Sequence, residues 1–271
     1  MCVKTKMSVS SQNTHKIAKN TFMLYIRMLL TMLVALYTSR VVLEVLGVED
    51  FGIYNVVGGV ITMLGFLTSS LSGAGSRFIT FALGKGDKEE QGQVYATVTI
   101  IHYLLAGIIV LLGETVGLWF VYNKLIIPVV RMEAALWVYH CSILTMVIAI
   151  ISTPYNALII AHEKMSIFAY ISVVEIVLKL AIVLVLVYIP YDKLITYSIF
   201  LMLVQLLIRV AYNTYCRKSF QESKAELKWY PKLIKEMSVY AGWTMNGNLA
   251  AVGYTQGINI LLNLFFGPLV N

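Results

Sequence analysis

The sequence has few charged residues for its size. Asp, Glu, Lys and Arg make up 13% of its 271 residues, whereas a soluble globular domain carries about 25%. Hydrophobic residues make up 59% of the chain, and the mean hydropathy is +0.77. This composition excludes an ordinary soluble domain and predicts a protein whose surroundings are mostly lipid.

The sequence also lacks the short motifs that mark common catalytic sites. It contains no nucleophile elbow, no HExxH and no paired-carboxylate hydrolase motif. The segment GKGDK, residues 84–88, lacks the Lys-Ser/Thr ending of a P-loop and follows no predicted strand. We therefore predict that the chain is not an enzyme and has no catalytic residues. Any uphill transport then depends on an ion gradient or on another subunit.

Cysteine and histidine are scarce and scattered. Cys2, Cys141 and Cys216 form neither a disulfide framework nor a metal-binding spacing. His102 and His140 each stand alone in an apolar run, where a hydrogen-bonded interior histidine is a better interpretation than a proton relay. We predict no metal and no cofactor, and the only small ion expected is a coupling proton or sodium ion.

A secretory signal peptide is missing. Residues 1–20 are polar and basic, without the short apolar core and small-residue cleavage site of such a peptide. The apolar run that starts at Thr21 is long enough to cross a bilayer, which takes about 20 helical residues. We expect this run to persist as a helix and residues 1–20 to form a cytoplasmic tail.

Seven long apolar runs follow one another, separated by short polar segments. Barrel strands would alternate apolar and polar residues over about 10 positions, and these runs are longer and uniformly apolar. Because the backbone must satisfy its own hydrogen bonds in lipid, the runs must be helices. We predict an all-α, polytopic helical membrane protein with about seven transmembrane helices, at residues 21–46, 53–83, 94–120, 134–160, 166–189, 194–215 and 238–266.

The lysines and arginines between the runs are unevenly distributed. The segments on the side of the N-terminus carry many, whereas those on the opposite side carry only Lys124, Arg131 and Lys193, with Arg40 near that edge. Because basic residues are retained on the cytoplasmic side, we predict a cytoplasmic N-terminus. The basic segment 216–237 is expected to form an amphipathic surface helix that contacts lipid headgroups and not nucleic acid.

Glu175 and Lys179 are the first candidates for a functional site. They lie four residues apart in the fifth run, so they share one helix face in the favourable order. They lie about 13 and 20 Å along the helix from its start. A lone charge at such depth costs at least about 2.5–3.5 kcal/mol. The pair either locks helix packing or lines a wet cavity that binds a substrate or an ion.

Three further charged residues are candidates in other runs. Arg77 follows the small-residue segment SSLSGAG, where an arginine can bind a phosphate or can reach the membrane interface from the end of the helix. Arg27 lies early in the first run, where the interface is within its reach. Glu114 lies in the outer part of the third run and is a candidate for proton coupling.

The seventh run carries three amides on one face. Gln256, Asn259 and Asn263 are spaced by three and four residues. Such amides either hold neighbouring helices together or line a surface that accepts sugars.

Several segments together resemble a known family. They are RVVLEVLGVEDFGIYNVVGG, SSLSGAGSRFITFALGKGD, STPYNALIIAHEKMSIFAYISVVEIVLKL and AGWTMNGNLAAVGYTQGINILLNLFFGPLVN. In this order they are similar to polysaccharide-export flippases, the Wzx-like members of the multidrug/oligosaccharidyl-lipid/polysaccharide (MOP) superfamily. The resemblance extends over the chain from Asn20 onward.

The resemblance implies two six-helix lobes that face each other across a central cavity. Residues 21–215 would form the first lobe, residues 216–237 the linker, and residues 238–271 the first helix of a truncated second lobe. Such proteins move undecaprenyl-diphosphate-linked oligosaccharides across the bacterial inner membrane by alternating access, for O-antigen or capsule synthesis.

The resemblance also implies roles for the candidate residues. Binding of the lipid-linked oligosaccharide is then expected at Arg77, Lys179, Arg27, Gln256, Asn259 and Asn263, and ion coupling at Glu175 and Glu114. A multidrug-type cation antiporter of the same superfamily remains an alternative, although basic groups in the runs outnumber deep acids. The other alternative is a non-transporting membrane scaffold.

Overall fold

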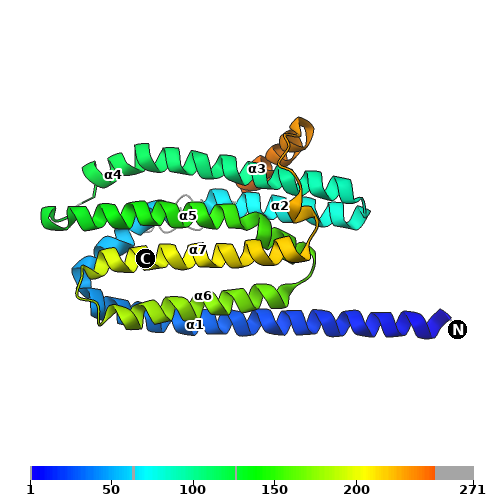
Figure 1. Ribbon diagram of the computed structural model, residues 1–271, viewed down its shortest axis with the longest axis horizontal. Coiled ribbons are helices and arrows are strands. Elements are labelled where there is room, and N and C mark those ends of the chain that lie inside the picture. The colour runs from blue at the N-terminus through cyan, green and yellow to red at the C-terminus, as the bar shows by residue number, and fades with distance from the viewer. Residues whose placement is uncertain (1, 63–64, 126, 248–271) are drawn as a thin grey trace, which may run out of the picture.

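The computed structural model describes residues 2–62, 65–125 and 127–247 of the chain. Every regular element within these ranges is helical. The fold is therefore the all-α helical bundle that the apolar runs predict, and its long helices lie roughly parallel in Figure 1.

The first helix, α1 (Cys2–Thr62), contains a sharp kink at Gly47. Gly47 has φ 81° and ψ 168°, a backbone conformation that only glycine adopts without strain. The kink falls in the segment LGVEDFG, residues 46–52, which separates the predicted runs 21–46 and 53–83. The predicted second run, residues 53–83, falls on the end of α1 beyond the kink and on α2 (Gly65–Lys85), on either side of residues 63–64, which lie outside the described ranges.

The third predicted run contains a local change of helix type. Helix α3 (Lys88–Leu112) is capped by the Asp87 carboxylate, which accepts a hydrogen bond from the Glu89 amide at 2.9 Å. It continues through the π-helical turn η1 (Gly113–Gly117) into α4 (Leu118–Asn123). The Tyr139 hydroxyl donates to the Gly113 carbonyl at 2.5 Å. A side chain at Gly117 would collide with that hydroxyl, so glycine is required there.

Three long helices complete the bundle. The short turn η2 (Val129–Arg131) leads into α5 (Met132–Ala161), which is followed by α6 (Met165–Leu186) and α7 (Lys193–Ser219). Beyond them lie η3 (Glu222–Lys224) and a further helical stretch over residues 231–247. Helix α5 is central, because it packs against α1, α2, α3 and α7. Its buried residues Ala157, Leu158 and Ile159 belong to the main hydrophobic core.

The connections alternate between the two ends of the bundle. In Figure 1 the N-terminus, the α2–α3 turn, the α5–α6 turn and the end of α7 lie at one end, and the bend in α1, α4 and the α6–α7 turn lie at the other. This is the alternation on which the predicted charge asymmetry depends.

Five helical stretches among the described residues are long and apolar enough to cross a membrane: Thr21–Gly59, Lys88–Asn123, Val129–Ala161, Met165–Leu186 and Lys193–Ser219. The protein is therefore a multi-pass membrane protein. Most of the predicted seventh run, 238–266, lies outside the described residues.

Candidate functional site

A cavity of about 490 Å³ opens between α1, α6 and α7. It contains two of the predicted binding residues and one of the predicted coupling residues. Its lining comes mostly from α1 and α6, with Tyr197 from α7: Arg27, Thr31, Val34, Ala35, Thr38, Ser39, Val42, Phe51, Tyr54, Asn55, Ser172, Glu175, Ile176, Lys179 and Tyr197. This is the strongest candidate for a binding site within the span of the membrane.

Glu175 and Lys179 form an ion pair on the cavity side of α6. The Lys179 ammonium donates to the Glu175 carboxylate at 2.6 Å, as their four-residue spacing predicts. The Glu175 side chain is 25% exposed and the Lys179 side chain 42% exposed. The ammonium has three donors and the carboxylate several acceptor positions, so one contact leaves both groups able to bind a ligand.

Arg27 reaches the same cavity from α1. Its Nη1 donates a long hydrogen bond of 3.4 Å to the Ser172 hydroxyl. Its guanidinium lies over the Phe168 ring, 4.5 Å from the ring centre. The Nε atom is buried and has no hydrogen-bond partner within the described part of the chain. A guanidinium carries five N–H donors, so most of the capacity of Arg27 to bind an anion is unused.

The charges of this cavity favour an anion. Among its lining residues two are basic and one is acidic. Hydroxyl and amide groups, including those of Thr31 and Asn55, add neutral polar groups to the wall. In a membrane interior, where charges are screened less than in water, an excess of positive charge attracts an oxyanion.

The other predicted residues lie elsewhere. Arg77 is exposed on α2, and its guanidinium lies 4.5 Å from the centre of the Tyr240 ring in the 231–247 helix. Glu114 lies in η1, and its carboxylate is 3.2 Å from the His140 ring. Neither residue lines the cavity between α1, α6 and α7. Gln256, Asn259 and Asn263 fall outside the described residues.

Comparison with protein families matches residues 17–270 to the family described as polysaccharide biosynthesis protein. The chain belongs to this family. Comparison with curated proteins finds no significant match.

Two solved structures support the same fold. One is described as the outward-facing conformation of a multidrug resistance MATE family transporter of the MOP superfamily, with a TM-score of 0.77 and 15% identity. The other is a crystal structure of MATE in the bent conformation, with a TM-score of 0.74 and 15% identity. Each alignment covers 93% of this chain, and the chain spans 56% and 57% of theirs. The family match thus confirms that the chain belongs to a polysaccharide family, as the sequence segments suggest, and the solved structures confirm the fold.

An unpredicted contact of this family member involves His140. Sequence analysis treats His140 as isolated, but the fold brings its ring to Glu114 across 26 residues. The prediction of a hydrogen-bonded interior histidine fits His102 better, because Nδ1 of that buried ring donates to the Val98 carbonyl at 2.8 Å. The packing of α3 against α5 and the hydrogen bond from Tyr139 to Gly113 bring Glu114 and His140 together, so no local sequence pattern indicates the pair.

A second unpredicted cluster lies at the end of the bundle that carries the Gly47 kink. Arg131 contacts Asp50 through Nε and Nη2 at 2.8 and 2.5 Å, and Asp192 through Nη1 at 2.5 Å. Asp192 also caps α7 by accepting from the Leu194 amide at 3.0 Å. Burial alone raises the pKa of the Asp192 carboxyl, but the Arg131 and backbone hydrogen bonds hold it below its ordinary value.

The segment after α7 differs from the predicted surface helix over residues 216–237. Helix α7 extends to Ser219, η3 follows, and a new helix begins at Pro231, a residue suited to the first helical position. His162, at the end of α5, pairs with Glu222 of η3 and stacks on Phe220, with ring centres 4.2 Å apart. These contacts attach the segment to the end of the bundle.

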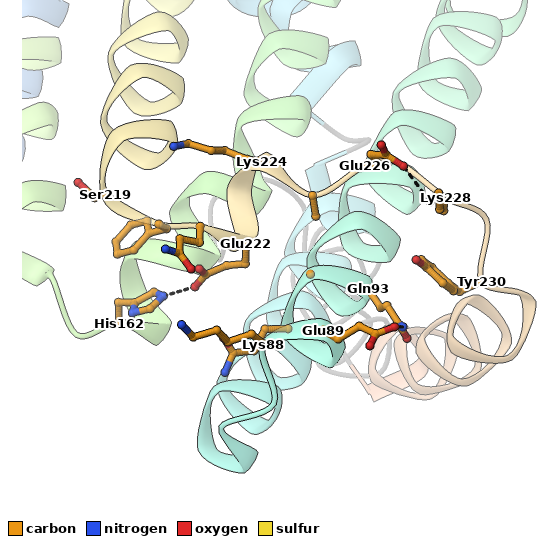
Figure 2. A pocket seen from close by; sticks show the side chains of 15 residues that line it. Lys88, Glu89, Gln93, His162, Ser219, Glu222, Lys224, Glu226, Lys228 and Tyr230 are labelled. Atoms are coloured by element: carbon orange, nitrogen blue, oxygen red, sulfur yellow. Dashed lines mark hydrogen bonds and ion pairs between the residues drawn. The ribbon is translucent and has the colours of Figure 1, made fainter.

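A polar cavity of about 710 Å³ lies beneath this segment, and Figure 2 shows its mixed lining. Basic side chains such as Lys88 and Lys224 alternate with Glu89, Glu222 and Glu226. The ion pair between Glu226 and Lys228, 2.8 Å long, lowers the pKa of Glu226 and raises that of Lys228. Because its charges are balanced, this cavity shows no clear preference for anions or cations.

Proposed function

We propose that the protein exports an undecaprenyl-diphosphate-linked oligosaccharide across the bacterial inner membrane, for O-antigen or capsule synthesis. The observation that supports this proposal most directly is the cation-rich cavity of Arg27 and Lys179 inside a membrane protein of the polysaccharide biosynthesis family. A lipid-linked oligosaccharide needs this combination, because its diphosphate is anionic while its carrier remains in lipid.

Each charged residue of the cavity has a distinct task in this proposal. The planar fork of Arg27 binds phosphate oxygens through two parallel hydrogen bonds, and the Lys179 ammonium acts as a point charge beside it. Glu175 holds Lys179 in place and binds the coupling proton or sodium ion when the lysine turns to the diphosphate. Arg77 lies on another surface, so the proposal depends on Arg27 and Lys179.

Transport would follow alternating access between this lobe and a second one. The N-terminus is proposed to be cytoplasmic, because the basic segments then lie on the inner side of the membrane. The cavity would accept the diphosphate from the inner leaflet and release it to the outer leaflet. Glu114, paired with His140, is a second proposed site for the coupling proton.

The test is Lys179→Ala in the chromosomal gene. We expect surface polysaccharide to be lost while the amount of the protein in the membrane stays normal, because the substitution removes the cation that attracts the diphosphate. Lys85→Ala is the matched control, since Lys85 pairs with Glu90 at the exposed α2–α3 turn. Polysaccharide would be measured on whole cells and protein by immunoblot of membranes.

Two results would count against the proposal. Normal polysaccharide from the Lys179→Ala strain would remove the Glu175–Lys179 pair from the mechanism. Unchanged polysaccharide together with greater sensitivity of the strain to cationic drugs would favour the multidrug antiporter. The single acidic group in the cavity argues against that alternative, because a cation site would need an excess of acids.

A further inference from the structure

A second cavity, of about 450 Å³, lies next to the charged one. It is lined by the end of α1 and by α2, α5 and α7. Tyr54 lines both cavities and packs edge-to-face on Tyr197, with ring centres 5.2 Å apart. The two cavities therefore adjoin at Tyr54.

The chemistry of the second cavity differs from that of the first. None of the described residues that line it is Asp, Glu, Lys, Arg or His. Its polar groups are hydroxyls and one amide, and they come from facing helices. Ser142, Thr145 and Thr153 lie along one face of α5, and Ser198 and Gln205 along one face of α7.

These polar groups retain hydrogen-bonding capacity. The hydroxyls of Thr153 and Ser198 donate to carbonyls of their own helices, at 3.3 and 2.8 Å, so their oxygens can still accept. Ser142, Thr145 and Gln205 form no hydrogen bond with the described residues, so they can both donate and accept. The cavity thus presents donors and acceptors without a fixed charge.

The remaining wall is apolar, with Ile61, Met146, Ile150 and Leu201. A charged group would lose its hydration here without gaining a counter-ion, which makes a phosphate or carboxylate an unfavourable occupant. A purely apolar chain would leave the hydroxyls and the amide without partners. An uncharged sugar satisfies both conditions, because its hydroxyls form hydrogen bonds and its C–H faces pack on apolar side chains.

We propose that this second cavity is the subsite for the uncharged sugars nearest the diphosphate. The diphosphate is held by Arg27 and Lys179, and the sugar chain passes Tyr54 into the cavity between α5 and α7. This inference rests on the proposed function, since it concerns the same ligand. The volume of the second cavity, about 450 Å³, lies within the range of about 300–1,000 Å³ usual for small-molecule sites.

The test compares two probes with one double variant. The variant is Thr145→Val with Gln205→Leu, which removes three polar groups while nearly keeping side-chain volume. The probes are undecaprenyl diphosphate and the lipid-linked oligosaccharide extracted from a host strain in which the gene is deleted. Their binding to the purified chain in detergent is measured by titration.

We expect the double variant to bind the oligosaccharide-bearing probe about tenfold more weakly, which corresponds to about 1.4 kcal/mol, the loss of one or two net hydrogen bonds. Binding of bare undecaprenyl diphosphate should remain unchanged. Lys179→Ala should weaken the binding of both probes. Thr80→Val is the control, because Thr80 bonds to the Ser76 carbonyl on α2 outside both cavities.

The outcomes separate the two proposals. If the double variant binds both probes as the wild type does, or weakens both equally, the sugar subsite is overturned while the diphosphate site stands. If Lys179→Ala binds undecaprenyl diphosphate normally, the proposed function itself fails. The melting temperature of the double variant in detergent, compared with Thr80→Val, checks that lost binding is not lost folding.

Discussion

Two clusters of charged residues in this molecule have opposite compositions. At the kinked end of α1, one arginine, Arg131, lies between two carboxylates, those of Asp50 and Asp192. In the cavity between α1, α6 and α7, two basic residues, Arg27 and Lys179, share the single carboxylate of Glu175. The first cluster is rich in acceptors and the second in donors.

The difference lies in how completely the donors are used. Arg131 has Nε, Nη1 and Nη2 all bound to carboxylate oxygens, and it ties the start of α5 to α1 and α7. Arg27 has one long hydrogen bond through Nη1 and a buried Nε without a partner among the described residues. A saturated arginine acts as a structural lock, whereas an unsaturated one beside a cavity is available for a ligand.

The strongest test of this comparison is Arg131→Ala. The substitution leaves the Asp50 and Asp192 carboxylates facing each other without their cation. We expect a loss of about 2 kcal/mol in the free energy of unfolding, between the values for surface and buried ion pairs, because the Arg131 side chain is 24% exposed. The melting temperature in detergent measures the effect, and Lys124→Ala at the same end is the control.

A rescue experiment identifies the cause of that loss. Adding Asp50→Asn and Asp192→Asn to Arg131→Ala removes the repulsion between the two carboxylates. Recovery of part of the melting temperature supports the interpretation of the cluster as a charge-balanced lock. If the single Arg131→Ala variant is as stable as the wild type, the number of hydrogen bonds that an arginine makes does not indicate a structural role.

The second prediction exchanges the charges of the cavity pair, in Glu175→Lys with Lys179→Glu. The ion pair is kept, but the positive charge moves one helical turn, about 6 Å along α6. We expect stability to change by less than about 0.5 kcal/mol, while surface polysaccharide falls about tenfold because the cation no longer faces the diphosphate beside Arg27.

Stability is measured by the melting temperature of the purified variant in detergent, and polysaccharide is measured on whole cells of the strain that carries it. Full polysaccharide output from the exchanged pair would mean that the pair only locks helix packing. It would then resemble the Arg131 cluster in function despite its different composition.

The sequence predicts those parts of the molecule that depend on local pattern. Hydropathy locates the helices because a span in lipid must be apolar and must satisfy the hydrogen bonds of its own backbone. The LGVEDFG segment predicts the break at Gly47, and the i, i+4 spacing predicts the Glu175–Lys179 contact. Each of these features is decided within a few residues of the chain.

Other parts depend on how the helices pack, which local pattern does not encode. Arg131 and Asp50 are 81 residues apart, and Arg131 and Asp192 are 61 apart. The small residues before Arg77 suggest that it faces a cavity. In the structure its guanidinium lies over the ring of Tyr240, which belongs to the helix at 231–247. The cavity also contains Arg27. From the sequence, a position near the membrane interface is enough to explain this arginine, so the sequence does not place it beside Lys179.

The last and smallest expected effect concerns the pH dependence of the saturated cluster. The hydrogen bonds that Asp192 accepts from Arg131 hold the pKa of the Asp192 carboxyl below its ordinary value of about 3.9. A lowered pKa in the folded state means that the carboxylate stabilises the fold fully above that ordinary value. This stabilisation is lost as the pH falls through the lowered pKa. Asp192→Asn keeps the cap of α7, because asparagine also caps helices, but it loses this charge-dependent stabilisation.

Melting temperatures in detergent at pH 7, 5 and 3 measure the effect. The wild type should melt at a higher temperature than Asp192→Asn at pH 7 and pH 5. The underlying difference in the free energy of unfolding should be less than about 1 kcal/mol, because the ion pair is partly exposed. The difference in melting temperature should narrow at pH 3. Asp87→Asn is the matched control, because it alters the cap of α3 without breaking an arginine pair. A gap that stays constant from pH 7 to pH 3 would mean that Asp192 acts through its cap alone, and that Arg131 is held by Asp50.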